Sequence, residues 1–292
     1  MSLALLVFGR TGQVATELQR LAGPDLRMNA LDRAAADLAV PSACAAAIAT
    51  TDADVVINAA AWTAVDRAEA EEDAAMVVNG HAPGAIARAC AARGLPFLHV
   101  STDYVFDGSG ARAWREDDTV SPINAYGRTK LEGERQVAAA GGPHAILRTS
   151  WVFSAHGANF VKTMLKHGAL RDQLKVVDDQ RGGPTAAADI AAALVAMARA
   201  FNEGRGVSGV FHFAGAPTVS WRDFAVEIFR QADWMRAPDV APIRTEDWPT
   251  PAARPANSAL DCAKIEAAYG IAQPDWRASL GRVLAELKET AE

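Results

Sequence analysis

The chain has 292 residues, of which 50% are hydrophobic and 22% charged, and its formal net charge is −6. This length suits one large or two closely associated domains with a substantial core. The negative charge and the lack of any block rich in lysine and arginine argue against a nucleic-acid-binding surface. The cysteines Cys44, Cys90 and Cys262 are far apart and show no metal or redox spacing, which favours a reducing, cytoplasmic environment.

The N-terminal apolar run Leu3–Phe8 ends at Gly9 and is too short to cross a membrane. No basic segment precedes it, so we expect a buried strand rather than a signal peptide or membrane anchor. Short apolar runs then alternate with amphipathic, alanine-rich stretches, which predicts a doubly wound parallel α/β sheet with helices on both faces. The predicted strands are Leu3–Phe8, Leu26–Leu31, Asp54–Asn58, Pro96–Ser101 and Ala145–Thr149, and the predicted helices are Gln13–Leu21, Pro41–Thr50, Glu72–Ala92 and Asn124–Ala140.

After Thr149 a helix near Asn159–His167, a strand near Leu174–Val177, a helix near Ala187–Phe201 and a strand near Val210–Phe213 are expected to extend the sheet. From Pro217 onward helices dominate, and five prolines between Pro238 and Pro255 make a long regular element there improbable. We therefore predict a sheet domain from 1–150 and about 174–214. A smaller, mainly helical domain from about 151–173 and 215–292 should cover the strand ends, where such sheets bind ligands.

A glycine-rich turn, Gly9-x-x-Gly12-x-x-Ala15, follows the first strand and opens a helix. This context is typical of a phosphate-binding turn, because the glycines allow close approach and the helix N-terminus attracts an anion. Asp32 ends the second strand about 20 residues on, where a carboxylate receives ribose hydroxyls. Arg33 is equally suited to a 2′-phosphate, which leaves the choice of dinucleotide open. Asp37 and Leu38 are candidates to flank the adenine.

Two later strands also end in candidate site residues. Asn58 begins a run of small residues at the end of the third strand, where the backbone can approach a cofactor, and Trp62 follows that run. Ser101 and Thr102 close the fourth strand, and the next helix carries Tyr126 and Lys130 four positions apart. Such a pair shares one helix face. A lysine ammonium there is expected to lower the tyrosine pKa, so that the phenol donates a proton to a carbonyl oxygen braced by Thr102.

With these motifs the chain resembles the extended short-chain dehydrogenase/reductases and, within them, the dTDP-4-dehydrorhamnose reductases. The resemblance covers essentially the whole chain. It is carried by Phe8–Val14, Asn58–Glu69, Ser101–Phe106, Tyr126–Glu132, Arg148–Phe153, Asn159–Leu165, Asp179–Thr185 and Arg254–Ser258. It implies a Rossmann-like NAD(P)-binding domain, a sugar-nucleotide-binding domain and NADPH- or NADH-dependent reduction of the 4-keto group of dTDP-4-dehydro-β-L-rhamnose to dTDP-L-rhamnose.

The resemblance also implies roles for individual residues. Tyr126 would donate the proton, Lys130 would tune it and hold the nicotinamide ribose, and Thr102 would orient the ketone. Thr102, Asp103 and Trp151 would meet the sugar nucleotide. The cofactor would be bound by Gly9, Gly12, Gln13, Val14, Asp32, Asp37, Leu38, Ala61, Trp62, Thr63, Tyr126 and Lys130.

The chain departs from the family pattern at two positions. Trp62 stands where the family commonly has histidine. Some members dimerise through magnesium held by carboxylates, and Glu17 matches one such position, but Ala188 replaces an expected glutamate. We therefore expect no metal in the chemistry, magnesium at most as a structural ion, and a monomer or homodimer that binds neither nucleic acid nor membrane.

Two alternative functions stay open. A nucleotide-sugar epimerase or dehydratase would share Tyr126 and Lys130, although dehydratases usually add acidic residues beside the threonine and here Asp103 is followed by Tyr104. A non-catalytic protein resembling the regulatory subunit of methionine adenosyltransferase is the other. The sequence decides neither the preference between NADH and NADPH nor the oligomeric state.

Overall fold

The computed structural model describes residues 2–290 and has a six-stranded sheet at its centre. The strands lie in the order β10-β5-β4-β3-β1-β2, and each pairs in parallel with its neighbours. Their bounds are β1 (Leu3–Phe8), β2 (Leu26–Leu31), β3 (Val55–Asn58), β4 (Phe97–Thr102), β5 (His144–Thr149) and β10 (Gly209–His212). The predicted doubly wound parallel α/β sheet is confirmed.

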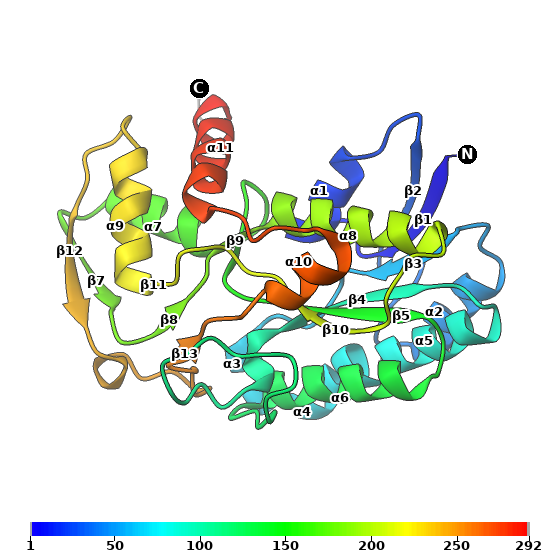
Figure 1. Ribbon diagram of the computed structural model, residues 1–292. Coiled ribbons are helices and arrows are strands. Elements are labelled where there is room, and N and C mark those ends of the chain that lie inside the picture. Colours follow the sequence, from blue (N-terminus) through cyan, green and yellow to red (C-terminus); the bar gives the residue numbers. More distant parts are fainter. Residues whose placement is uncertain (1, 291–292) are drawn as a thin grey trace.

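Helices cover both faces of this sheet, as Figure 1 shows. On one face α1 (Gln13–Arg20) packs against α8 (Ala187–Asn202); on the other α2 (Pro41–Ala49), α5 (Ala82–Ala92) and α6 (Ala125–Ala139) pack side by side. Each face of the sheet has its own hydrophobic core. Successive residues of β1 contribute to these two cores alternately, because neighbouring side chains of a strand point to opposite faces. Leu5 and Val7 join the core under α1 and α8, whereas Leu6 and Phe8 join the core under α2 and α5.

The predicted helix Glu72–Ala92 has a wider turn in its middle. It consists of α4 (Glu72–Met76), the π-helical turn η1 (Val77–His81) and α5. Asn79 in that turn is buried; its side chain accepts from the Trp62 N–H at 2.8 Å and donates to the Thr129 hydroxyl at 3.1 Å. The widened turn thus ties the loop after β3, which also holds the short helix α3 (Val65–Ala70), to α6. Turns of this kind are frequent at functional sites.

One predicted strand lies elsewhere than expected. β7 (Gln173–Val177) does not extend the central sheet but pairs in parallel with β12 (Asp239–Ile243), which lies in the proline-rich stretch. In β7 the side chains of Gln173 and Lys175 are exposed, whereas every residue of β1 is buried. The prediction was wrong because an apolar run shows that a strand forms, while the number of its covered faces decides which sheet can accept it.

Most of the remaining elements lie beside the carboxyl ends of the central strands, whereas α10 (Ala263–Tyr269) packs against β10 and α8. They comprise the 3₁₀ turns η2 (Asp103–Val105) and η3 (Thr245–Asp247), helices α7 (Phe160–Gly168), α9 (Trp221–Gln231), α10 (Ala263–Tyr269) and α11 (Trp276–Glu289), and strands β6 (Val152–Phe153), β8 (Arg181–Gly182), β9 (Thr185–Ala186), β11 (Val219–Ser220) and β13 (Asn257–Ser258). The predicted division into two domains stays a prediction. Among residues 2–290, no helix has the length and apolarity that crossing a membrane requires.

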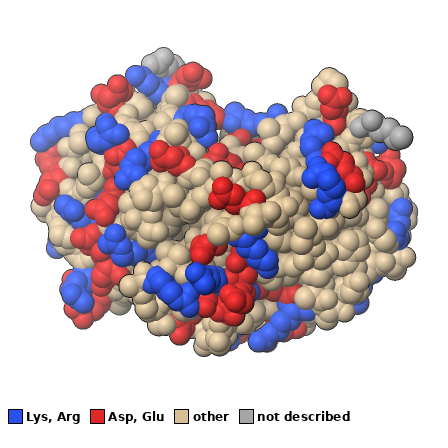
Figure 2. Space-filling model, in the orientation of Figure 1, with Lys and Arg blue, Asp and Glu red and all other residues tan. Residues whose placement is uncertain are grey.

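Charged side chains are mixed by sign over the face shown in Figure 2. Many are paired there or elsewhere on the surface, for example Arg67 with Glu71 at 2.6 Å and Arg112 with Asp118 at 2.6 Å. Exposed pairs of this kind add little stability. The face in view does not present the extended basic surface that nucleic acid requires.

Candidate active site

A cavity of about 830 Å³ lies at the carboxyl ends of β1, β3, β4 and β5. The chain leaves β1 toward β2 on one side and returns to β3 on the other, so the cavity is at the point where the strand order reverses. Open α/β sheets bind dinucleotides at such a point. All the predicted site residues except Trp62 line it: Gly9, Gly12, Gln13, Val14, Asp32, Asp37, Leu38, Ala61, Thr63, Thr102, Asp103, Tyr126, Lys130 and Trp151.

The turn between β1 and α1 has the backbone that a pyrophosphate needs. Gly9 has a φ of +105°, and a Cβ there would lie 3.3 Å from the Ala60 Cβ, so only glycine suits the position. Gly12 is the N-cap of α1 and offers no side chain to the first-turn N–H groups. Those groups are free to bind phosphate oxygens at the positive end of the helix. Among the described residues, this turn therefore fits the predicted dinucleotide.

The end of β2 presents charges of both signs to the expected adenine ribose. The Asp32 carboxylate accepts from the Ala35 N–H at 3.0 Å and lies 3.5 Å from the Arg10 guanidinium. The Arg33 side chain is 88% exposed and lies 3.9 Å from Asp37. Arg10 and Arg33 both line the cavity. Our sequence reasoning missed Arg10, although its place inside the glycine-rich turn is a signal for it.

Trp62 lies outside the cavity lining. Its indole N–H donates to the Ala64 carbonyl at 3.2 Å, and the Arg67 guanidinium lies 4.9 Å from the ring centroid. The ring belongs to a small apolar cluster that also includes Tyr126. Ala61 and Thr63 on either side do line the cavity, so the loop rather than this indole faces the expected cofactor. The contact predicted for Trp62 stays a prediction.

Thr102 and Tyr126 are brought together by the close approach of α6 to the turn after β4. Asn124 caps α6 by accepting from the Gly127 N–H at 2.8 Å, and a Cβ at Gly127 would lie 2.1 Å from the Tyr104 carbonyl oxygen. The Tyr126 and Tyr104 rings meet edge to face at 5.5 Å. The absence of a side chain at Gly127 thus allows Tyr126 to reach the strand end that carries Thr102.

The ionisation of Tyr126 and Lys130 differs from the sequence-based expectation. Burial raises the pKa of Tyr126 well above its ordinary value, the nearby Thr102 hydroxyl opposes this, and the Asp103 charge adds to it. Burial lowers the pKa of Lys130 to about 8, while Glu134 acts in the opposite direction. The Lys130 Nζ donates to the Val100 carbonyl at 2.7 Å. The predicted lowering of the Tyr126 pKa by Lys130 is thus not found, and burial is the largest cause of the observed rise.

Asp103 is a buried carboxyl group in the cavity wall. Its Oδ1 accepts from the Thr102 hydroxyl at 3.1 Å, and its Oδ2 has no hydrogen-bond partner within residues 2–290. Burial raises the pKa of Asp103 to about 7, against the nearby Ser258 and Thr102 hydroxyls. A buried polar atom without a partner is costly, so Oδ2 is suited to a polar group of a bound ligand.

Trp151 lines the cavity in an unusual backbone conformation, with a φ of +49°. Its indole stacks on that of Trp221, with ring centroids 3.5 Å apart and planes 10° apart. A Cβ at Gly182 would lie 2.6 Å from Trp151 Cε2, so Gly182 and Trp221 together confine the ring. Non-glycine residues with positive φ cluster at ligand sites. Trp221 also lines the cavity, and our sequence reasoning missed it.

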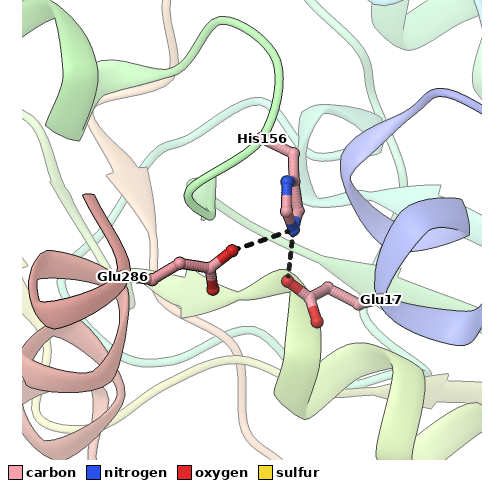
Figure 3. A group of neighbouring side chains, drawn as sticks. All are labelled: Glu17, His156 and Glu286. Carbon is pink, nitrogen blue, oxygen red and sulfur yellow. Dashed lines mark ion pairs between the residues drawn. The ribbon is translucent and has the colours of Figure 1, made fainter. Parts of the chain in front are cut away.

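A group of charged residues joins the first and last helices near the cavity. Figure 3 shows His156, from the loop after β6, pointing between Glu17 of α1 and Glu286 of α11. The His156 Nε2 lies 3.1 Å from the Glu17 carboxylate and 3.8 Å from that of Glu286. Arg20 donates to Glu286 at 2.7 Å and to Glu17 at 3.3 Å. The ligand atoms of Glu17, His156 and Glu286 lie close enough together to hold a metal ion, and Arg20 contacts both carboxylates. The expectation that the chemistry needs no metal stays a prediction.

The fold and this site together define a nicotinamide-dependent short-chain dehydrogenase/reductase. The family model described as the RmlD substrate binding domain matches residues 3–289. A dTDP-4-dehydrorhamnose reductase of Sinorhizobium fredii is 44% identical over 96% of this chain and 96% of its own length. That of Escherichia coli K12 is 38% identical over 98% of each chain. The chain therefore belongs to the dTDP-4-dehydrorhamnose reductase family, as the sequence motifs predict, and it is an NAD(P)H-dependent oxidoreductase.

Solved structures agree with this assignment. A Clostridium acetobutylicum dTDP-4-dehydrorhamnose reductase superposes with a TM-score of 0.91 at 37% identity, covering 98% of this chain and 100% of that chain. A Bacillus anthracis dTDP-4-dehydrorhamnose reductase in complex with NADP gives the same TM-score at 32% identity, with the same coverage. A UDP-Glc/GlcNAc 4-epimerase of Campylobacter jejuni, at 17% identity and a TM-score of 0.79, shares the fold alone.

Proposed function

We propose that the protein reduces the 4-keto group of dTDP-4-dehydro-β-L-rhamnose to give dTDP-L-rhamnose. The observation that carries this proposal is the single cavity that Thr102, Tyr126 and Lys130 share with the glycine-rich turn and Trp151. One end of the cavity thus fits a dinucleotide, and the other offers a proton donor beside residues suited to a sugar nucleotide.

In this proposal, bound NADPH or NADH supplies a hydride to the carbonyl carbon of the sugar. Tyr126 gives its phenolic proton to the carbonyl oxygen, so that the ketone gains one hydride on carbon and one proton on oxygen and becomes an alcohol. The raised Tyr126 pKa keeps this proton in place at neutral pH until negative charge develops on the oxygen. Thr102 holds the oxygen, and Lys130 holds the nicotinamide ribose.

Asp103 and Trp151 have the role of holding the sugar. The unpartnered Asp103 Oδ2 is a hydrogen-bonding site for a sugar hydroxyl. The Trp151 indole, fixed by Trp221, presents an apolar edge to the deoxysugar. Because a ketosugar is small and neutral, its nucleotide supplies most of the binding energy that positions the ketone.

The test is oxidation of NADPH or NADH by the purified protein with dTDP-4-dehydrorhamnose generated in situ. Stoichiometric formation of dTDP-L-rhamnose supports the proposal. An epimerase instead retains NAD through purification and interconverts sugars without net cofactor oxidation. A protein that turns over nothing alone but binds methionine adenosyltransferase would be the regulatory subunit, and either outcome would overturn the reductase assignment.

A further inference from the structure

The hydroxyl group of Thr102 has a single hydrogen, and two acceptors compete for it. A threonine hydroxyl donates once and accepts twice. The Thr102 Oγ1 accepts from the Tyr104 N–H at 3.2 Å and lies 3.1 Å from the Asp103 Oδ1. The proposed reaction requires the same hydrogen on the sugar ketone. Thr102 therefore cannot donate to Asp103 and to the ketone at the same time.

The ionisation state of Asp103 decides which acceptor receives this hydrogen. A carboxylate only accepts, so an ionised Asp103 takes the Thr102 hydrogen on Oδ1. A protonated carboxyl group has a hydrogen of its own, which it can donate to the second lone pair of Thr102 Oγ1. Asp103 is 3% exposed, and its Oδ2 has no hydrogen-bond partner among residues 2–290. Both features favour the neutral form.

We propose that Asp103, in its protonated form, is a positioning residue that turns the Thr102 hydroxyl hydrogen toward the ketone. This inference rests on the proposed function and adds a control of it by pH. With the proton on Oδ1, the Oδ2 atom stays available to a sugar hydroxyl, so the two roles of Asp103 fall on different oxygens. Ionisation of Asp103 withdraws the Thr102 hydrogen from the ketone, and reduction slows.

The uncharged groups around Asp103 place its titration close to neutral pH. Burial raises the pKa of Asp103 to about 7, and the hydroxyl groups of Ser258 in β13 and of Thr102 act in the opposite direction. On α6, burial keeps Tyr126 a neutral phenol. A change of about one pH unit on either side of neutrality therefore changes the fraction of Asp103 that is protonated.

Two sets of charges also lie in this region. Lys130, one turn after Tyr126 on α6, has a pKa of about 8 and is mainly an ammonium ion at pH 7. Arg254, in the loop before β13, is paired with Asp66 of α3 at 2.9 Å. Because Lys130 loses its charge near pH 8, the experiment must separate its titration from that of Asp103, which comes first as the pH rises.

The first measurement is kcat as a function of pH, with saturating NADPH and dTDP-4-dehydrorhamnose generated in situ. Asp103→Asn keeps the shape of the side chain but cannot ionise, so only the titration of Lys130 remains in this variant. We expect the loss of kcat between pH 6 and pH 8 to be about tenfold larger in the wild type than in Asp103→Asn. Asp117→Asn, at an exposed carboxylate, is the matched control and should keep the wild-type profile.

The second measurement needs no substrate. NMR of protein labelled with [γ-¹³C]aspartate follows the ionisation of Asp103 directly, and Asp103→Asn identifies its resonance. We expect a midpoint near pH 7. Thr102→Val removes the hydroxyl group that stabilises the carboxylate and should raise this midpoint by about half a unit or more. Thr102→Ser restores a hydroxyl group and should return the midpoint toward the wild-type value.

An Asp103 resonance that titrates together with the exposed aspartates would overturn the inference, because the carboxylate would then hold the Thr102 hydrogen at neutral pH. An equal loss of kcat between pH 6 and pH 8 in the wild type and in Asp103→Asn would also overturn it. So would an unchanged Asp103 midpoint in a folded Thr102→Val variant. Failure of the proposed function is distinguishable, because it would appear as no turnover by the wild type at any pH and would leave the NMR titration as it is.

Discussion

At the scale of single residues, the Tyr126 hydroxyl is the group whose removal isolates the proton transfer. Tyr126→Phe keeps the ring that packs on Tyr104, so the fold should survive and kcat should fall by about 10²-fold or more. The measurement is steady-state oxidation of NADPH. The matched control is Tyr104→Phe, which removes the hydroxyl group from the neighbouring ring. This variant should reduce kcat far less than Tyr126→Phe does. Near-normal turnover in Tyr126→Phe would remove Tyr126 from the mechanism.

The choice of dinucleotide depends on charges at the end of β2. The Asp32 carboxylate repels a 2′-phosphate, whereas Arg10 and Arg33 attract it. Asp32→Ala should shift the ratio of kcat/KM values toward NADPH, and Arg10→Ala or Arg33→Ala should shift it toward NADH. Since Arg10 contacts Asp32 and Arg33 is mostly exposed, Arg10→Ala should have the larger effect. If the ratio of kcat/KM values for NADPH and NADH were unchanged in all three variants, none of these residues would contribute to recognition of the adenine ribose.

At the scale of elements, β8 positions Trp151 because its residue Gly182 has no side chain and leaves room for the indole ring. A Cβ at Gly182 would lie 2.6 Å from the Trp151 indole, so Gly182→Ala must displace the ring. We expect kcat/KM for the sugar nucleotide to fall by about tenfold or more, because small displacements in a binding site are costly to the rate. The affinity for NADPH, measured by calorimetry, should stay unchanged.

Gly23→Ala is the control for this experiment, because a Cβ at Gly23 meets no atom within 4 Å. It carries the same chemical change at an open position of the chain. Trp151→Ala should reproduce the loss seen in Gly182→Ala. A normal kcat/KM in both the Gly182 and Trp151 variants would exclude this ring from sugar-nucleotide binding.

At the scale of the whole molecule, a ligand that binds only the folded state raises its stability. We expect dTDP to raise the melting temperature and to compete with the substrate, and free rhamnose to do neither. The reason is that the nucleotide rather than the sugar supplies most of the binding energy. Calorimetry that detects no dTDP binding at millimolar concentration, with or without NADPH, would contradict the nucleotide-sugar assignment.

The stability of the whole chain should also depend on pH through Asp103. Its folded pKa is raised from 3.8 to about 7, so the folded state holds this proton more tightly than the unfolded state. The resulting stabilisation is complete below about pH 4 and is lost as the pH rises to 7, at about 1.4 kcal/mol for each unit of pKa difference. Asp103→Asn should therefore raise the melting temperature at pH 8 much more than at pH 4.

The control is Asp117→Asn, at an exposed carboxylate, which should change the melting temperature little at either pH. Thermal unfolding followed by circular dichroism at several pH values gives the comparison. An Asp103→Asn variant with the same gain at pH 4 and pH 8 would show that the Asp103 carboxyl group does not retain its proton in the folded protein.

The sequence by itself determined the central sheet and the end of it at which the cavity lies. Local signals suffice for this, because the period of the apolar residues distinguishes strand from helix and Gly9 marks the turn that follows β1. The order of Thr102, Tyr126 and Lys130 after successive strands was also enough to predict one site, since parallel strands end at the same edge of a sheet.

The tertiary structure decided which groups meet across long stretches of chain. It paired β7 with β12, placed Arg10 against Asp32, stacked Trp151 on Trp221 and set His99 against Lys130. It also reversed the expected direction of the Tyr126 pKa shift. These properties depend on burial and on neighbours far away in the sequence, because desolvation and contact geometry act through space and leave no periodic pattern along the chain.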